Sequence, residues 1–138
     1  MKKRILIIFS ICISLQINAQ NENFLQGLVL LEQKKYEEAI TSFNAALKDS
    51  PSNPSCWERR GYALFCAKHP YEAINNYTMA ILLSPKNSPY YVQRALAYHE
   101  TGNFNAMVND LTTAARIGDL SAQEFLERHS ISWKLTDN

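Results

Sequence analysis

The chain has 138 residues, of which 46% are hydrophobic and 20% are charged, and its formal net charge is +1. These proportions are ordinary for a soluble globular domain, and a single domain is the expectation at this length. With only four glycines and five prolines, the sequence excludes a collagen-like or proline-rich disordered chain. The near-neutral charge provides no basic face for phosphates, so we expect no nucleic-acid partner.

The first 19 residues have the order of a secretory signal peptide. Three basic residues at positions 2–4 precede an apolar run from Ile5 to Leu15, and a polar stretch then ends at Ala19. The apolar run is shorter than the roughly 20 residues that a membrane-spanning helix needs. We expect cleavage after Ala19 and export to the periplasm or secretion. Retention of the segment as an uncleaved anchor is the alternative.

One phrase of the sequence occurs twice. Residues 36–51 read YEEAITSFNAALKDSP, and residues 71–85 read YEAINNYTMAILLSP. Small residues, aromatic residues and prolines match in pairs at one constant spacing: Gly27 and Gly61, Ala39 and Ala73, Phe43 and Tyr77, Ala46 and Ala80, Pro51 and Pro85. A third, looser copy contains Ala95, Tyr98, Met107, Leu111 and Ala114. A fixed period of about 34 residues indicates an array of structural repeats.

The spacing of apolar residues predicts two helices in each copy. Ala39, Phe43 and Ala46 stand at i, i+4 and i+7, which is the apolar stripe of an amphipathic helix. The prolines and the turn-rich stretches 49–55 and 84–89 separate the helices and supply polar caps. We therefore expect helices over residues 22–33, 37–48, 55–67, 71–82, 89–100 and 104–116.

The segment after the third copy predicts a capping helix that ends at residue 128. Gly118 is suited to the C-cap of the preceding helix, and Asp119 and Ser121 can open the next one. Terminal repeats need cover of this kind. Leu120, Phe125 and Leu126 should cover the last repeat, Trp133 should lie against the cap, and Gln123, Glu124, Glu127 and Arg128 should face water.

Cys56 and Cys66 fall on one predicted helix. Ten residues at about 1.5 Å each place them roughly 15 Å apart, whereas a disulfide needs Cα atoms within about 7 Å. We expect free thiols, with an intermolecular bridge as the alternative.

The repeated pattern resembles the tetratricopeptide repeat family, whose unit is a pair of antiparallel helices. The residues that match its W…G…Y…A…F…A…P order are Trp57, Gly61, Leu64, Ala73, Tyr77, Ala80 and Pro85. The resemblance implies an all-α, right-handed solenoid of helix hairpins. Its units would cover residues 20–53, 54–87 and 88–119, with a capping helix and tail over 120–138.

Two arginines replace the leucine that the family favours before the glycine position. We expect Arg60 to reach Asn76 and Arg94 to reach Asp110, in each case on the second helix of the same unit. These pairs are expected to be structural. The small residues should let the helix backbones approach closely, and the aromatic residue between each pair of alanines should fill the space beside that contact.

The sequence contains no motif for nucleotide binding, zinc ligation or hydrolysis. His69, His99 and His129 are evenly spaced and are expected to spread along the solenoid rather than converge on a metal. We therefore predict no enzyme activity, no metal and no cofactor.

The resemblance also implies a binding surface, because in this family the first helix of each unit lines a concave side that holds a protein or peptide. The matching positions are Phe24, Leu28, Glu58, Arg59, Tyr62, Phe65, Val92, Gln93, Leu96 and His99. Phe65 and Leu96 could instead pack only between adjacent units. The lysine and asparagine clamp that one subfamily uses for acidic tails is missing here, so a mixed apolar segment is the expected ligand. A non-catalytic protein-binding scaffold is the leading hypothesis, and a self-associating homo-oligomer is the alternative.

Overall fold

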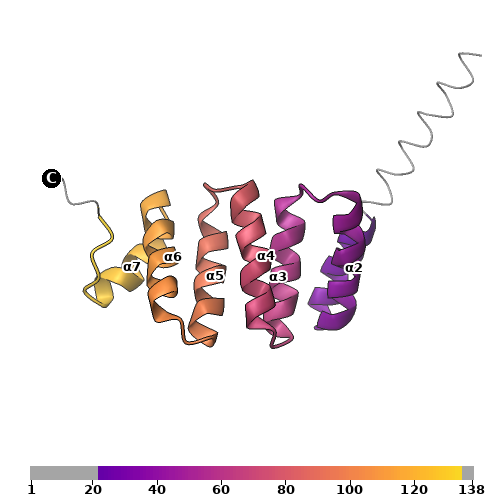
Figure 1. The fold of residues 1–138 in the computed structure, drawn as a ribbon, viewed down its shortest axis with the longest axis horizontal. Helices are drawn as coiled ribbons and strands as arrows, with labels where there is room; N and C mark the ends of the chain where they lie inside the picture. Colours follow the sequence, from indigo (N-terminus) through magenta and orange to yellow (C-terminus); the bar gives the residue numbers. More distant parts are fainter. Residues whose placement is uncertain (1–21, 135–138) are drawn as a thin grey trace, which may run out of the picture.

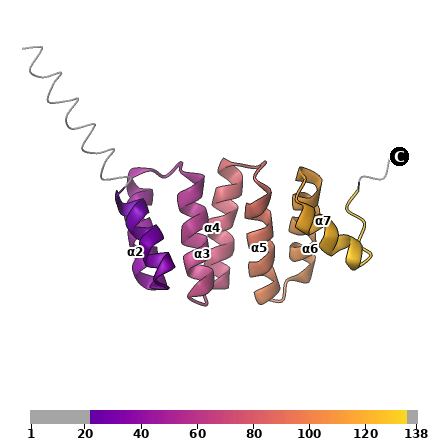
Figure 2. The same cartoon turned by 180° about the vertical axis from the view of Figure 1, so that it is seen from behind.

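The computed structural model describes residues 22–134 and shows a stack of antiparallel helices (Figure 1). The described part begins in a helix over residues 22–32, and no strand occurs within it. Consecutive helices lie side by side in both views (Figure 2). The predicted all-α solenoid of helix hairpins is therefore confirmed. The remaining helices are α2 (Tyr36–Asp49), α3 (Pro54–Cys66), α4 (Pro70–Leu83), α5 (Ser88–Glu100), α6 (Phe104–Ile117) and α7 (Leu120–Arg128).

The predicted signal peptide, residues 1–19, and its cleavage site lie outside the described residues. Within residues 22–134, no helix is both long enough and apolar enough to cross a membrane. Cleavage and anchoring of the N-terminal segment both stay predictions.

Proline and asparagine mark where the helices begin. Pro54 and Pro70 are the first residues of α3 and α4, where the missing N–H costs no intrahelical hydrogen bond. The side chain of Asn53 accepts hydrogen bonds from the backbone N–H groups of Ser55 and Cys56, at 3.0 and 3.3 Å. Helices α2 to α5 each begin one residue before the predicted start, and for α3 and α4 the added residue is this proline.

In the first two hairpins, an aromatic ring lies directly against a glycine of the partner helix. A Cβ atom on Gly27 would come within 2.5 Å of the Phe43 ring, and one on Gly61 within 2.9 Å of the Tyr77 ring. Both rings are fully buried. Glycine is required at these two positions because any side chain would force the helices apart. The close approach of the helix backbones that the sequence predicted is present.

Arg60 joins three helices. From α3 it donates one hydrogen bond to Asn76 on α4 and another to Asn44 on α2, each at 2.7 Å. Its guanidinium also lies 4.7 Å from the centre of the Trp57 ring, within cation–π range. The predicted contact with Asn76 is confirmed, and the contact with Asn44 additionally links the first repeat to the second.

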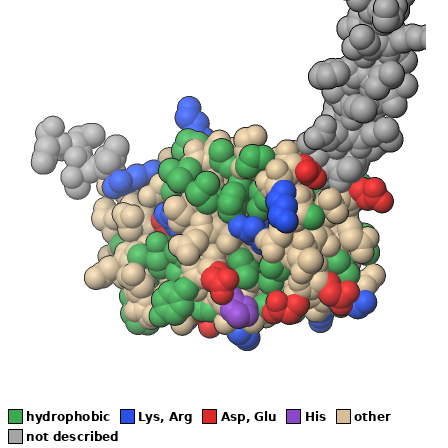
Figure 3. Space-filling model, turned by 45° about the vertical axis from the view of Figure 1, so that its right-hand side comes forward, with side chains coloured by type: hydrophobic (Ala, Val, Ile, Leu, Met, Phe, Trp, Pro, Cys, Tyr) green, Lys and Arg blue, Asp and Glu red, His purple; other side chains and the backbone are tan. Residues whose placement is uncertain are grey.

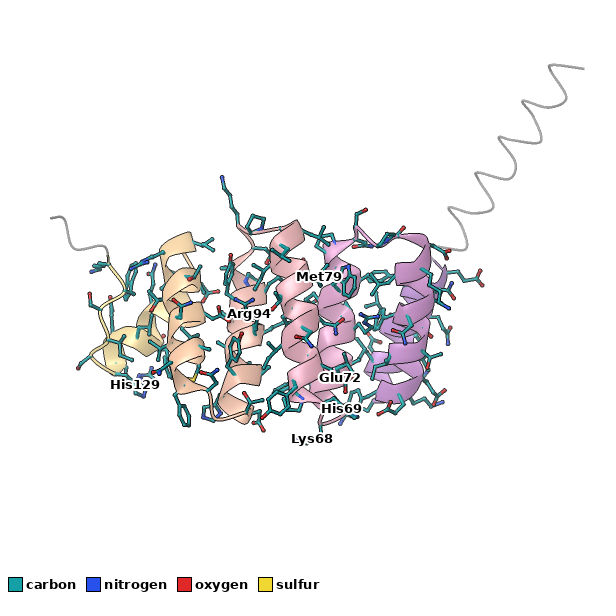
Figure 4. The ribbon with its side chains drawn as sticks, in the orientation of Figure 1. Lys68, His69, Glu72, Met79, Arg94 and His129 are labelled. Carbon is teal, nitrogen blue, oxygen red and sulfur yellow. The ribbon has the colours of Figure 1, made fainter. Side chains whose placement is uncertain are left out.

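Arg94 occupies the equivalent place on α5 (Figure 4). It donates two hydrogen bonds to the carboxylate of Asp110 on α6, at 2.8 and 2.7 Å, and one to the hydroxyl of Thr78 on α4, at 2.9 Å. The predicted ion pair with Asp110 is confirmed. Both arginines therefore connect one hairpin to the hairpin before it.

Helix α7 covers the last hairpin. Gly118 ends α6 in a left-handed conformation with φ 111°, and Asp119 caps α7 by accepting a hydrogen bond from the Ala122 N–H at 2.9 Å. Ala122 and Leu126 are buried against α6. Leu120 does not contribute to this cover, contrary to the sequence prediction. Its side chain is 76% exposed, because the first residue of the helix lies on the side away from Ala122 and Leu126.

The tail returns to the helix that precedes α7. Trp133 packs against the last hydrophobic cluster, as the sequence predicted, and its carbonyl accepts a hydrogen bond from Arg116 at 2.9 Å. The sequence prediction that Gln123 faces water is wrong. Its side chain donates to the carbonyl of Ala115 at 2.9 Å, which ties α7 to the end of α6.

Candidate functional site

Three clefts lie along the first helices of the three hairpins. One position of the repeat contributes a residue to each cleft: Leu31 to the first, Phe65 to the second and His99 to the third. A second position, occupied by Leu28, Tyr62 and Leu96, contributes to the first and third clefts. Because equivalent residues of stacked repeats lie on the same side, the clefts share one surface. We call this surface the groove face and define it by these six residues.

The first cleft, of about 370 Å³, lies between the helix over residues 22–32 and α3. Its lining consists of Leu28, Leu31, Glu32, Arg59 and Tyr62. The side chain of Tyr62 is 42% exposed, and that of Arg59 is also open to solvent. An exposed tyrosine beside an exposed arginine is a combination enriched where proteins bind one another.

Glu58 is the predicted site residue that departs most from expectation. It is only 5% exposed, so the structure contradicts its placement on the open surface. Its carboxylate lies 3.1 Å from Nε of Arg59, and this pairing offsets the cost of burying the charge. Burial and the charge of Glu58 raise the pKa of the neighbouring Tyr77 phenol. Glu58 therefore supports the cleft from inside, and Arg59 is the member of the pair that reaches the surface.

The thiol of Cys66 lies next to Tyr62. Hydrogen bonding to the Cys66 side chain and the electrostatic influence of that group, together with burial, raise the pKa of the Tyr62 phenol. Cys56 and Cys66 are both free, as the sequence predicted. Tyr62 is thus a neutral hydrogen-bonding group at the surface of the first cleft.

The second cleft is small, about 140 Å³, and is lined by Phe65, Lys68, Pro70 and Glu100. Phe65 also packs against the buried cluster that contains Leu64 and Tyr77. The side chain therefore has both roles that the sequence left open, since it joins adjacent units and contributes to the groove face.

The third cleft, of about 610 Å³, is the most apolar of the three. Leu96 and Phe104 are 56% and 58% exposed there, which is unusual for side chains of this size. The lining comes from α5 (Val92, Ala95, Leu96, His99), α6 (Phe104, Met107, Leu111) and α7 (Ser121, Ala122, Phe125, His129). It thus brings together the last full hairpin and the capping helix.

Seven of the ten predicted groove residues line one of these clefts, and Phe24, Glu58 and Gln93 do not. Phe24 packs against Phe43, with the ring centres 5.8 Å apart. The side-chain oxygen of Gln93 is buried without a hydrogen-bond partner in the described structure. Sequence reasoning missed Leu31, although it has the place in the first repeat that Phe65 has in the second, and it also missed the contributions of α6 and α7.

Two of the three histidines, His99 and His129, belong to the lining of the third cleft, to which α5, α6 and α7 contribute. His69 lies elsewhere, at the start of α4 (Figure 4). Among residues 22–134, no group of three or more histidine, cysteine or acidic side chains is placed to hold a metal ion.

His69 lies between two carboxylates. Its Nδ1 is 3.1 Å from Glu72 and its Nε2 is 3.9 Å from Glu37. A space-filling view shows acidic side chains gathered around a histidine at one edge of the molecule, with apolar side chains above them (Figure 3). All three side chains are exposed, so the group forms a solvated surface cluster rather than part of a cleft.

Comparison with known proteins agrees with this geometry. Residues 27–65 match a model described as TPR repeat, and residues 88–117 match one described as Tetratricopeptide repeat. The Tetratricopeptide repeat protein 36 homolog of Drosophila pseudoobscura pseudoobscura is 27% identical over 115 residues, which are 80% of this chain and 62% of that protein. The chain thus spans less than two thirds of that relative's length.

Two solved structures share the fold. The Arabidopsis OM64 TPR domain has a TM-score of 0.74 at 19% identity, covering 83% of this chain and 98% of that domain. The first TPR of Spaghetti (RPAP3), bound to the HSP90 peptide SRMEEVD, has a TM-score of 0.74 at 21% identity, covering 82% and 91%. With the repeated glycine–aromatic contacts and the two matching repeat models, these likenesses show that the chain belongs to the tetratricopeptide repeat family.

Proposed function

We propose that this protein is a non-catalytic scaffold that binds a protein or peptide partner along the groove face. The observation that carries the proposal is the recurrence of the clefts: equivalent residues of three successive hairpins line them, so one extended segment can contact all three. The buried ion pair of Arg94 and Asp110 and the helix caps of the described residues serve the fold. The proposed structural units are those expected from the sequence, residues 20–53, 54–87 and 88–119, followed by the cap and tail.

The composition of the groove face favours a ligand with mixed polar and apolar side chains. Leu28, Leu31 and Tyr62 offer apolar contact, and Arg59 offers a charged hydrogen-bond donor. The related fold of Spaghetti holds an HSP90 peptide, which supports an extended peptide as one form of ligand. Because the identity is only 21%, the likeness concerns the fold and not the choice of peptide.

A photo-crosslinking experiment tests the proposal. Benzoylphenylalanine placed at Tyr62 should capture peptides from a random phage-displayed library, and the same group placed at Leu82 should not. Leu82 is a matched control because it is an exposed residue of α4 that lines none of the clefts. Equal capture at both positions would contradict binding at the groove face.

Self-association is a second candidate function, favoured by one observation. Leu25 and Val29 stand one turn apart on the helix over residues 22–32 and are both exposed, so this helix presents an apolar strip on the outside of the stack. A second copy could cover that strip. Light scattering after size exclusion would support this candidate if the chain were dimeric and became monomeric with Leu25→Ser/Val29→Ser.

We also propose that the protein is exported, on the basis of the basic residues and apolar run within residues 1–19. Intact mass of the protein recovered from the periplasm or medium tests this. A mass that begins at residue 20 supports cleavage after Ala19, and a mass that retains Met1 contradicts it.

A further inference from the structure

The outward face of α4 is apolar, whereas that of α2 is polar. The exposed residues of α2 are Glu37, Glu38, Thr41, Asn44, Lys48 and Asp49. Those of α4 are Tyr71, Glu72, Asn75, Met79, Leu82 and Leu83. Tyr71 and Leu82 are 70% and 69% exposed, and Met79 and Leu83 are 36% and 39% exposed. Because α2 and α4 are both second helices of their hairpins, the repeat does not by itself require this apolar surface. Contiguous exposed apolar surface is typical of interaction sites.

The four apolar side chains, those of Tyr71, Met79, Leu82 and Leu83, form one strip, which we call the α4 strip. Tyr71, Met79 and Leu82 stand at i, i+8 and i+11, and Leu83 adjoins Leu82, so all four fall on one side of the helix. Met79 lies in the upper half of α4, and Glu72 lies near its lower end (Figure 4). None of the four apolar residues lines a cleft of the groove face. The α4 strip is therefore a separate surface.

The two ends of the α4 strip carry opposite charges. Glu72 lies in the first turn of α4, and Lys86 lies in the turn that follows the helix. Both side chains are exposed. At the acidic end, His69 lies 3.1 Å from Glu72 and 3.9 Å from Glu37 of α2, so two carboxylates share one imidazole there. Lys68, in the turn before α4, lines the second cleft and therefore belongs to the groove side.

The helices beside α4 do not reverse this order of charges. On α2, Glu37 and Glu38 lie in the first turn and Lys48 lies in the last, which is the order found on α4. Lys35 lies 3.9 Å from Glu38, and Asp49 follows Lys48, so the contrast between the ends of α2 is smaller. Helix α6 has no acidic residue in its first turn and a basic one in its last. The outward face is therefore more acidic where these helices begin and more basic where they end.

We propose that the α4 strip joins two copies of this chain through a two-fold axis that sets the two α4 helices antiparallel. Met79 stands midway between Glu72 and Lys86 in the sequence. In this dimer Glu72 of each copy faces the partner's Lys86, and the two Met79 side chains meet near the axis. An interface between identical copies must be complementary to itself, and an apolar strip with one acidic end and one basic end meets this condition. A parallel arrangement would place like charges opposite each other, which is unfavourable.

The end helix, over residues 22–32, suits a second copy less well than α4 does. Its exposed apolar residues, Leu25 and Val29, lie between Glu22 and Glu32, which are both exposed. A second copy would therefore bring carboxylates together in either direction. The α4 dimer gives the second candidate function, self-association, a defined surface, and it rests on that candidate rather than on the groove face. It leaves the groove face open on both copies, because the α4 strip lines none of the clefts.

Sedimentation equilibrium of the full chain tests the dimer. The wild type should pass from monomer to dimer as its concentration rises. Met79→Ser/Leu82→Ser should raise the dissociation constant of the dimer at least about tenfold, a difference of about 1.4 kcal/mol. Both side chains are exposed, so the variant should fold, and circular dichroism checks this. A wild type that stays monomeric, or a folded variant that dimerises as strongly as the wild type, would overturn the inference.

Two charge variants test the antiparallel arrangement. Glu72→Lys alone and Lys86→Glu alone each place like charges together at both ends of the contact, so each should weaken its own dimer about tenfold. When the two variants are mixed in equal amounts, they should form mainly the heterodimer, because every charge of one copy then faces an opposite charge on the other. Native mass spectrometry with one variant isotopically labelled measures the proportion of heterodimer. A random mixture of the three dimers would contradict the arrangement.

Variants away from α4 serve as matched controls. Glu124→Lys and Arg128→Glu alter an exposed ion pair of α7, at the far end of the stack (Figure 1), and should form dimers at random when mixed. Leu25→Ser/Val29→Ser removes two exposed apolar side chains from the end helix and should leave the dissociation constant unchanged. Loss of the dimer in Leu25→Ser/Val29→Ser and not in Met79→Ser/Leu82→Ser would assign the contact to the end helix and overturn the inference.

The tests of the α4 dimer and of the groove face can fail separately. Capture of peptides at Tyr62 by a chain that stays monomeric would support the groove face and overturn the dimer. A dimer that Met79→Ser/Leu82→Ser separates, in a chain that captures no peptide at Tyr62, would support the dimer and contradict binding at the groove face.

Discussion

Arg94 and Asp110 form a two-pronged ion pair between α5 and α6, with N–O distances of 2.8 and 2.7 Å. Asp110 is only 2% exposed, so its charge depends on this partner. The hydrogen bond to Asp110 raises the pKa of the Arg94 guanidinium, and the arginine therefore stays charged throughout the neutral range. Since Arg94 also binds Thr78, the pair connects the second hairpin to the third.

Removing the arginine should be more damaging than removing the whole pair. Arg94→Ala leaves a buried carboxylate without a partner and should lower the free energy of unfolding by about 3–5 kcal/mol. Arg94→Leu/Asp110→Leu removes both charges and should lose less. Urea denaturation near neutral pH measures the difference. A loss below about 1 kcal/mol for Arg94→Ala is the value expected of a surface ion pair. It would show that the buried carboxylate of Asp110 does not depend on Arg94.

Gly61→Ala should destabilise the protein despite the higher helix propensity of alanine. The added Cβ would lie 2.9 Å from the Tyr77 ring, and overpacking of this kind costs about 1–3 kcal/mol. In a Tyr77→Leu background the same change should cost little, because that pair reproduces the Ala95 and Leu111 combination of the third hairpin. Thermal unfolding of the wild type, Gly61→Ala, Tyr77→Leu and the double variant measures the cost of Gly61→Ala in each background. Equal costs in the two backgrounds would refute the close packing of Gly61 against Tyr77.

Lys34→Gly should stabilise the fold by up to about 1 kcal/mol. Lys34, Lys68 and Gly102 occupy the same place in three hairpins and all have positive φ, at 59°, 68° and 74°. The left-handed conformation costs a non-glycine residue about 1–2 kcal/mol. This cost exceeds the free energy by which the extra entropy of glycine stabilises the unfolded chain. As a control, Lys48→Gly within α2 should destabilise by about 1 kcal/mol. The prediction fails if the melting temperature falls with Lys34→Gly.

Stability should fall in alkaline solution partly because of Cys56. Burial raises the pKa of its thiol from 9.0 to about 11, against a smaller opposing effect of Arg60. The unfolded chain therefore loses this proton first, and the stabilisation present below pH 9 is lost as the pH rises toward about 11. At about pH 10 the loss should be about 1 kcal/mol. Cys56→Ala should show a correspondingly shallower decline in unfolding free energy between about pH 8 and pH 10, and an identical decline would contradict this origin.

The periodic features of the fold could be predicted from the sequence, because each residue there has an equivalent in the neighbouring repeat. The glycine–aromatic contacts and the two arginine pairs are of this kind. The left-handed Gly118 after α6 could be predicted as well, because glycine is the residue that suits a helix C-cap. Features that depend on how an end helix is placed could not be predicted. No repeat follows α6, so the angle of α7, which places His129 in the lining of the third cleft and leaves Leu120 exposed, has no template in the pattern.

The burial of Glu58 could not be predicted for a different reason. Helical spacing places it on the same side as Tyr62 and Phe65, and the sequence does not show that Arg59 turns back to pair with it. Whether a charged side chain on such a face reaches water depends on the neighbouring hairpins. Leu28, Tyr62 and Leu96 line clefts, as their repeated positions led us to expect, whereas Glu58 and Gln93 do not; the role of these residues in binding stays a prediction.

The central claim is that the groove face binds a partner segment, and calorimetric titration of a library-selected peptide tests it most directly. Arg59→Ala/Tyr62→Ala should weaken binding about tenfold or more, since arginine and tyrosine commonly dominate such contacts, while Leu82→Ala on α4 should leave it unchanged. Dissociation constants that are equal in the wild type and the Arg59→Ala/Tyr62→Ala variant would contradict the claim.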